Sequence, residues 1–217
     1  MIVNYFSENE NYITSALRPF GPTIMKFRLP ELLISDFNKS CDEIIKNKEL
    51  AQSLDFSENL VGKVKQELLI PEEVMDKHIT YFYKALGNYY RFLVQNELAK
   101  KTSSINTEVK SAWFVRSFAG DFNPGHIHNN CNMTCVGYLK LPEWQEEQRR
   151  DSEDHHPSVG HLDFIQGPCA PLQRHNHSVL PKVGDFYLFP AHLIHTVYPF
   201  RSDGERRSFS INFNLSE

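Results

Sequence analysis

The chain has 217 residues, of which 41% are hydrophobic and 12% aromatic, so it can bury one hydrophobic core and is not typical of a disordered protein. Its formal net charge of −4 excludes the basic excess that draws a whole protein to nucleic acid or to an anionic membrane surface. We therefore expect a single domain over residues 1–217 that binds neither.

Targeting signals and paired cysteines are both missing from the sequence. The first residues, MIVNYFSENENYITS, show no basic segment followed by an apolar one, as a signal peptide would. No stretch approaches the roughly 20 apolar residues of a membrane-spanning helix. Cys41, Cys131, Cys135 and Cys169 lack the spacing of a disulfide framework or a zinc ribbon, which favours free thiols. These features predict a cytoplasmic protein and leave its oligomeric state open.

Residues 1–108 carry mainly helical patterns. Hydrophobic residues recur at spacings of three and four over residues 33–45, after Pro30, and again over residues 75–93, after Pro71. Each pattern predicts a helix with one buried face. We therefore expect a mainly helical N-terminal layer.

Residues 109–217 change to strand and turn patterns. Short segments rich in aromatic and β-branched residues are bounded by Gly, Pro, Asn or Asp: SAWFVRSF, MTCVGYLKL, GHLDFI, GDFYLFP, HLIHTVYPF and RRSFSINFNL. Several short strands without long helices between them indicate a β-sandwich or barrel. The predicted fold is α+β, with an antiparallel double-stranded β-helix (jelly-roll) core at 109–217 and an α-helical N-terminal layer.

Histidines gather in this second half, and three of them have the spacing of a metal site. His126 and His128 are separated by one residue, so on a strand both side chains project from the same face and can share one metal ion. His195 follows a distant predicted strand and can supply a third nitrogen. Ligands from two strands leave open positions opposite them, which redox-active iron needs for a cosubstrate and oxygen.

The last predicted strand carries a possible carboxylate anchor, Arg206 and Ser208, again on one face. A guanidinium binds a carboxylate through two parallel hydrogen bonds, and a neighbouring hydroxyl can add another donor. This pair suits the distal carboxylate of 2-oxoglutarate, whose keto-acid end chelates iron. Arg207 alternates to the opposite face, where we expect a surface charge.

Taken in order, these motifs resemble the 2-oxoglutarate- and Fe(II)-dependent oxygenase superfamily, most closely its prolyl-hydroxylase-like members with a His-x-His motif. The similar segments are Trp113, GDFNPGHIHNN, TCVGYLKLP, PKVGDFYLFPAHLIH and RRSFSIN. The resemblance implies Fe(II) as the metal, 2-oxoglutarate and O2 as cosubstrates, and no catalytic side chain beyond the metal site. It also implies that the Tyr138 hydroxyl donates to 2-oxoglutarate, with aromatic packing as the alternative role of that residue.

The chain departs from the superfamily at one ligand, because most members have His-x-Asp where this sequence has His126 and His128. Either His128 replaces the carboxylate, or iron keeps His126 and His195 with water in the third position; we expect His128 to bind. A literal His-x-Asp occurs at His161 and Asp163. It lies so close to His195 in sequence that little chain is left for the strands between them, so we do not expect it to hold the metal.

These features predict an oxygenase that converts 2-oxoglutarate to succinate and CO2 while it hydroxylates an unactivated C–H bond. The prolyl-hydroxylase resemblance favours a protein or peptide side chain as substrate, with a small molecule as the other option. We expect the loops at 143–159 and 168–180 to contact it. Two alternatives stay open: a three-histidine cupin dioxygenase that binds substrate directly to iron without 2-oxoglutarate, and a non-enzymatic jelly-roll binding module.

Overall fold

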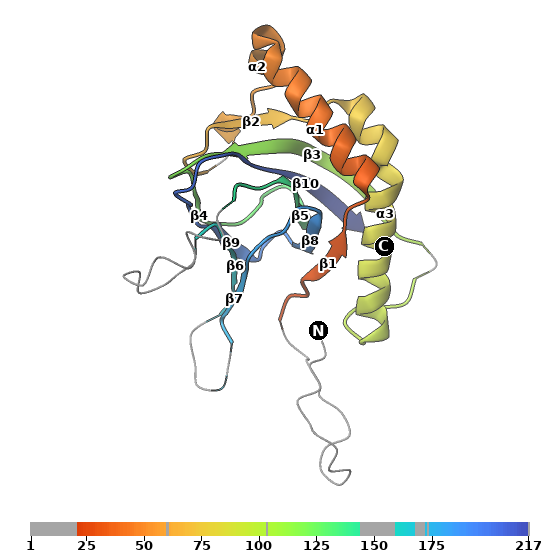
Figure 1. Ribbon diagram of the computed structural model, residues 1–217. Helices are drawn as coiled ribbons and strands as arrows, with labels where there is room; N and C mark the ends of the chain where they lie inside the picture. The colour runs from red at the N-terminus through yellow and green to blue at the C-terminus, as the bar shows by residue number, and fades with distance from the viewer. Residues whose placement is uncertain are drawn as a thin grey trace.

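Two antiparallel β-sheets face each other, and helices cover the outer side of the larger sheet (Figure 1). This computed structural model describes residues 21–59, 61–102, 104–143, 159–167, 172 and 174–216. Residues 144–158 of the first loop expected to contact substrate, and residues 168–171 and 173 of the second, therefore lie outside the described residues, His155, His156 and Cys169 among them. Within the second expected loop, Asn176–Val179 form a strand, β7.

The larger sheet has six strands in the order β1-β8-β5-β10-β3-β2. In that order they span Met25–Arg28, Asp185–Pro190, Met133–Lys140, Arg206–Ser216, Asn106–Ser117 and Gln66–Leu69. The smaller sheet has the order β4-β9-β6-β7, with strands Asn123–His126, Ile194–Val197, Leu162–Ile165 and Asn176–Val179. All neighbouring strands are antiparallel, so the core is a sandwich of the type that the strand patterns predicted.

The N-terminal half contributes strands as well as helices. Helices α1 (Glu31–Lys46) and α3 (Glu72–Gln95) match the two predicted amphipathic helices, and each begins directly after a proline. The short helix α2 (Lys48–Ser53) and the 3₁₀ turn η1 (Ser57–Asn59) follow α1. Strands β1 and β2 form the two edges of the larger sheet. Each has only four residues, too few for a hydrophobic pattern to predict a strand. None of the described helices is long and apolar enough to span a membrane.

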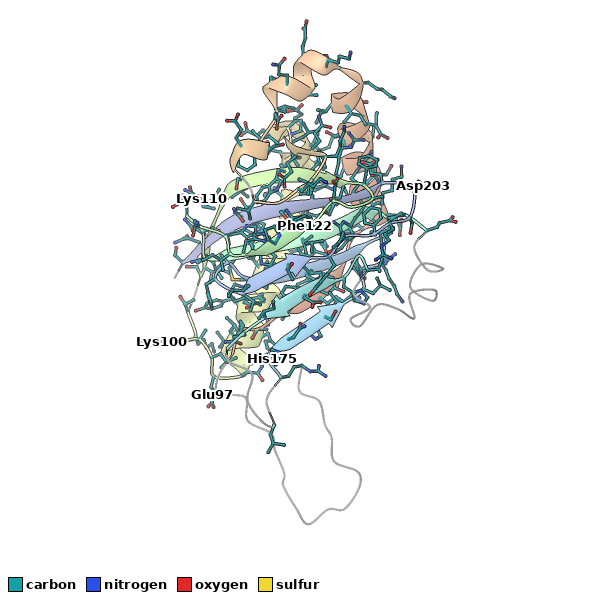
Figure 2. The ribbon with its side chains drawn as sticks, turned by 90° about the vertical axis from the view of Figure 1, so that its left-hand side faces the viewer. Glu97, Lys100, Lys110, Phe122, His175 and Asp203 are labelled. Carbon is teal, nitrogen blue, oxygen red and sulfur yellow. The ribbon has the colours of Figure 1, made fainter. Side chains whose placement is uncertain are left out.

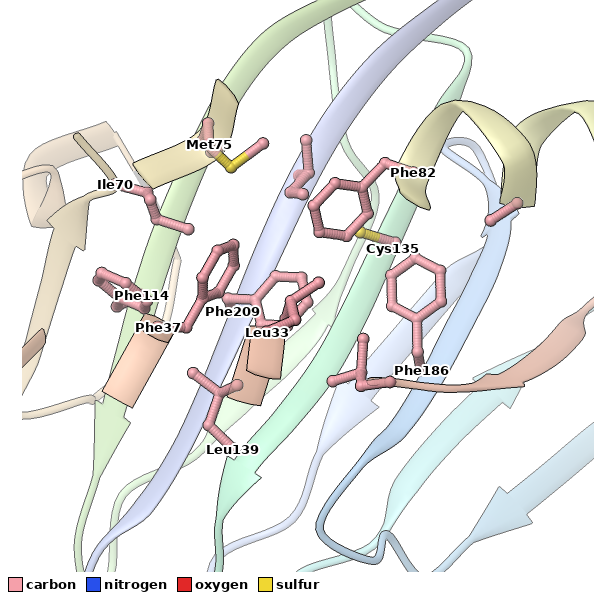
Figure 3. Close-up of a cluster of buried hydrophobic side chains, with 14 of the residues drawn as sticks. Leu33, Phe37, Ile70, Met75, Phe82, Phe114, Cys135, Leu139, Phe186 and Phe209 are labelled. Carbon is pink, nitrogen blue, oxygen red and sulfur yellow. The ribbon is translucent and has the colours of Figure 1, made fainter. Parts of the chain in front are cut away.

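Aromatic side chains fill the space between the helices and the larger sheet. Phe37 of α1 packs edge-to-face on Phe209 of β10 and Phe114 of β3, with ring centroids 5.0 Å and 5.7 Å apart. Phe82 of α3 and Phe186 of β8 extend the cluster, as Figure 3 shows. Offset and edge-to-face aromatic pairs add to the stability that burial of these rings provides. This core holds one face of the larger sheet rigid.

Strand β10 divides its side chains between this core and the opposite face. Phe209, Ile211 and Phe213 belong to the core under the helices. The alternating residues Arg206, Ser208, Ser210 and Asn212 line a cavity on the other face. A strand with period-two alternation thereby fixes the positions of the cavity residues through the packing of their neighbours.

The expected surface charge at Arg207 is wrong. Arg207 is only 3% exposed, because α1 covers its face of the sheet. Its guanidinium forms ion pairs with Glu205, at 3.0 Å, and with Asp42 of α1, at 2.8 Å. One carboxylate on α1 and one next to β10 thus pair with a charge that strand alternation alone had assigned to solvent.

Candidate active site

Three histidines from two segments, residues 126–128 and strand β9, line the same cavity. His126 at the end of β4 lies opposite His195 of β9 in the register of the smaller sheet. His128 follows β4, and its backbone N–H donates to the Ala191 carbonyl at 2.9 Å. The potential ligand atoms of the three side chains all lie within 4.8 Å of one another. The structure therefore brings together the three histidines that the sequence singled out.

The hydrogen bonds of the three rings leave one nitrogen of each available. The Nδ1–H groups donate to three oxygen acceptors: His126 to the Pro124 carbonyl at 2.7 Å, His195 to the Leu193 carbonyl at 3.0 Å, and His128 to the Asn212 amide oxygen at 2.7 Å. An oxygen acceptor at Nδ1 requires the proton there, so Nε2 carries a lone pair. This is the tautomer in which imidazole binds a metal through Nε2.

All three imidazoles are held neutral. Burial lowers the pKa of His195 to about 3 and that of His128 to about 4, and it also lowers the pKa of His126. The Nε2 atoms of His128 and His195 face each other at 3.3 Å with no proton to share. Two imidazole ligands at right angles around a metal, each about 2.0–2.1 Å from it, would place their nitrogens about 3 Å apart. The site therefore fits a divalent metal ion such as Fe(II), which would relieve this contact between two lone pairs.

Neither member of the literal His-x-Asp motif joins this group. Asp163 on β6 is fully buried and accepts a hydrogen bond from Asn176 at 2.9 Å, while His161 Nδ1 donates to the Val159 carbonyl. Leu162, between them, lines the cavity, so strand alternation turns Asp163 away from it.

The cavity between the sheets has a volume of about 520 Å³ and contains a buried arginine. Arg206 is 2% exposed and donates to the Tyr198 carbonyl at 3.1 Å, with its guanidinium carbon 5.4 Å from the centre of the Phe200 ring. Among the described residues no carboxylate forms an ion pair with it. Burial lowers the pKa of Arg206 to about 10, so the group remains charged at neutral pH. A buried charge with no ion-paired carboxylate among the described residues suits the binding of an anion.

Two hydroxyls near this arginine also lack partners. The Oη atom of Tyr138 and the Oγ atom of Ser117 are buried without a hydrogen bond. Ser208 lies beside Tyr138 in the register of β10 and β5, and Ser208, Tyr138 and Ser117 all line the cavity. Burial raises the pKa of Tyr138, so its hydroxyl keeps the proton that it can donate. A carboxylate between these donors would satisfy groups that otherwise cost free energy.

Three residues that the sequence analysis did not assign to the site hold His128 in place. Asn212 accepts from its ring, and Thr134 Oγ1 lies 3.2 Å from the same Nδ1 and donates to Asn212 Oδ1 at 2.9 Å. The Trp113 ring stacks on that of His128 with centroids 5.8 Å apart. Continuing the alternation from Arg206 and Ser208 along β10 would have pointed to Asn212.

Comparison with known proteins agrees with this geometry. A family model described as "Putative 2OG-Fe(II) oxygenase" matches residues 111–212, a range that contains the three histidines, Arg206 and Asn212. Over residues 111–212, just under half of its length, the chain matches the 2-oxoglutarate- and Fe(II)-dependent oxygenases. This oxygenase accordingly uses Fe(II) and 2-oxoglutarate and is a dioxygenase, as the sequence motifs predicted. No functionally curated protein matches it significantly.

Solved structures share the fold of this oxygenase at low sequence identity. A prolyl-4-hydroxylase from Pseudomonas putida has a TM-score of 0.53 and 19% identity, covering 88% of this chain and 91% of its own. A Trichoplax adhaerens prolyl hydroxylase, in complex with a hypoxia inducible factor oxygen degradation domain peptide fragment, has a TM-score of 0.55 and 14% identity, covering 89% and 83%. A viral collagen prolyl hydroxylase from Paramecium Bursaria Chlorella virus-1, solved as a 2OG complex, has a TM-score of 0.50 and 17% identity, covering 89% and 96%. The antiparallel core is thus of the jelly-roll type found in these enzymes.

Proposed function

We propose that this oxygenase hydroxylates a side chain of a protein or peptide. In the reaction, 2-oxoglutarate, O2 and a C–H group of the substrate give succinate, CO2 and the hydroxylated product. The observation that carries the proposal is one cavity lined by three neutral imidazoles and by a buried arginine that has no carboxylate partner among the described residues.

The histidines would hold the metal, and the buried donors would hold the cosubstrate. His126, His128 and His195 would bind Fe(II), which supplies the activation of O2 with electrons from 2-oxoglutarate. Arg206 would bind the distal carboxylate of 2-oxoglutarate through its guanidinium fork, with the hydroxyls of Tyr138 and Ser208 as further donors.

Two features of the chain would favour a productive complex. The amide of Asn212 holds the His128 ring with Nε2 toward the metal position. Apolar walls that include Leu162, Phe189 and Val197 reduce the water in the cavity and so strengthen its electrostatic interactions.

The surroundings of the cavity support a macromolecular substrate. Val61 and Ile127 line the cavity, yet they are 50% and 45% exposed. Phe122, another exposed apolar residue, lies on the face of the sheets shown in Figure 2, next to the cavity residue Asn123. Exposed apolar residues around a site are typical of surfaces that bind another chain. The related Trichoplax enzyme is seen with a peptide fragment, which agrees with such a substrate.

An anaerobic titration of the metal-free protein with Fe(II) and 2-oxoglutarate tests the assignment of these residues. We expect a visible charge-transfer band that needs both components and disappears in His195→Ala. Arg206→Ala should raise the 2-oxoglutarate concentration that gives half of the band about 100-fold. This is the loss of affinity expected when a buried charge-assisted pair is removed. Arg91→Ala, which removes an exposed arginine of α3, serves as the matched control.

The outcomes separate the proposed function from its two alternatives. The all-histidine ligand set favours a direct dioxygenase, which would bind iron without giving the band and would be unaffected by Arg206→Ala. A binding module would not bind iron, and its His195→Ala variant would differ from the unmodified protein only in stability.

A further inference from the structure

The cavity contains an acidic residue that the proposed reaction does not use. Glu67 of β2 is 3% exposed and lines the cavity. Its backbone bonds to Ser57 and Phe56, but its carboxylate forms no hydrogen bond or ion pair with a described residue. Carboxylates are rarely buried this far without a partner. A hydrogen-bond donor or a cation next to Glu67 would therefore stabilise its charged form.

The environment of Glu67 opposes its charge in the protein alone. Burial raises its pKa to about 7, and the nearby carboxylate of Asp55 adds to the effect. Among the described residues that line the cavity, Glu67 alone is acidic. Lys110 lies at the same cavity but forms its ion pair with Glu108, at 3.0 Å. A buried carboxylate in a cleft, with no described residue that pairs with it, is typical of a group that takes part in binding or catalysis.

Two aromatic residues, Phe56 and Trp113, line the same cavity as this carboxylate. Glu67 pairs with Val115 in the register of β2 and β3, and Trp113 is two residues along the same face of β3. The Trp113 ring lies 5.5 Å from that of Phe56, whose backbone N–H donates to the Glu67 carbonyl. Trp113 also stacks on His128, so this corner of the cavity adjoins the metal site. A carboxylate that lines one cavity together with two aromatic rings has the composition of a cation-binding site.

We infer that the substrate carries a basic group, an ammonium or a guanidinium, which forms an ion pair with Glu67 beside the Phe56 and Trp113 rings. The inference rests on the proposed function in treating the occupant as a peptide, so the basic group belongs to a lysine or arginine at or next to the hydroxylated residue. Pairing with a cation restores the charged form of Glu67, and desolvation by the aromatic walls strengthens the pair.

Binding of matched peptides tests the inference without turnover. The probes are capped pentapeptides Gly-Ala-X-Ala-Gly in which X is lysine, arginine, norleucine or glutamate. Their affinities are measured by calorimetry on protein loaded with Zn(II) and 2-oxoglutarate, and again on the metal-free protein. We expect the lysine or the arginine peptide to bind at least tenfold tighter than the norleucine peptide. Comparing the lysine peptide with the arginine peptide shows whether the site prefers an ammonium or a guanidinium group. Glu67→Gln should remove this preference while the affinity of the norleucine peptide stays unchanged.

Controls separate a lost subsite from a lost fold or a wrong function. Glu58→Gln changes an exposed carboxylate of the neighbouring 3₁₀ turn and should keep the preference. The thermal midpoint of Glu67→Gln should equal or exceed that of the unmodified protein. Equal affinities for all four peptides, the absence of binding by any of them, or a preference that survives Glu67→Gln would each overturn the inference. Failure of the proposed function would be seen in the anaerobic titration, as the absence of the Fe(II)–2-oxoglutarate band.

Discussion

The two faces of the larger sheet show how one set of strands can serve opposite purposes. Toward the helices, the alternating residues Phe209, Ile211 and Phe213 of β10 are apolar and belong to an aromatic-rich core. Toward the smaller sheet, the alternating residues are polar and line the cavity. Among the described residues, the buried Tyr138 hydroxyl there has no hydrogen-bond partner and the Glu67 carboxylate forms no ion pair. The first face stabilises the fold. The second holds charges and hydroxyls whose partners we expect to be the metal, the cosubstrate and the substrate.

The largest contrast in stability is expected between neighbours on β10. Phe209→Ala removes a fully buried ring in contact with Phe37 and should lower the free energy of unfolding by about 3–5 kcal/mol. Ser210→Ala, on the cavity face, should change it by less than about 0.5 kcal/mol. Urea denaturation of both variants measures the difference. Similar values for the two would show that the cavity face also carries stability.

The adjacent residues Arg206 and Arg207 show the same contrast between the two faces for buried charges. Arg207→Met leaves the buried Glu205 and the Asp42 carboxylate without this cation and should cost about 3 kcal/mol. Arg206→Met removes a buried cation that has no described carboxylate partner, so it should leave stability within about 1 kcal/mol while 2-oxoglutarate binding is lost. Chemical denaturation of each variant measures its stability, and titration with 2-oxoglutarate measures its affinity for the cosubstrate. A comparable loss of stability in Arg206→Met would contradict the assignment of Arg206 to a ligand.

The pH dependence of the free energy of unfolding should show how much the buried Glu67 carboxylate destabilises the fold when it is charged. Its pKa is raised from 4.5 to about 7 on folding, so the folded state binds the proton more tightly and stability falls as pH rises between these values. Glu67→Gln lacks this loss, so its advantage over the unmodified protein should be small at pH 4.5 and reach up to about 3 kcal/mol above pH 7. Denaturation curves across this pH range test it, with Glu58→Gln as the control. A pH-independent difference would show that the carboxylate is not strained.

The smallest expected effect concerns the residue that positions a ligand. Asn212→Ala removes the acceptor for His128 Nδ1–H and should weaken metal binding about 10–100-fold with little effect on folding. Asn214→Ala, on the same strand but outside the cavity lining, should leave metal affinity unchanged. A competition titration with Zn(II) and a chromophoric chelator measures both. Equal affinities would mean that packing alone, including that of Trp113, orients the ring.

The sequence alone predicted the parts of this protein that depend on local repetition. Period-two patterns placed the β10 residues Arg206 and Ser208 on one face, and spacings of three and four located α1 and α3, because backbone geometry sets these periods. The same reasoning grouped His126 and His128, and the order of motifs added His195.

Only the tertiary structure decided which side of each element meets which partner. It turned Arg207 toward Glu205 and Asp42 beneath α1, and it brought Glu67 from the edge strand β2 to the cavity that contains the three histidines. It also supplied Asn212 and Thr134 as partners of His128. The pairs Arg207–Asp42 and His128–Asn212 join residues far apart in the chain. A four-residue strand such as β2 is too short to show a hydrophobic period that would predict which residues it meets. Their positions follow from strand pairing and helix packing, which local propensity does not encode.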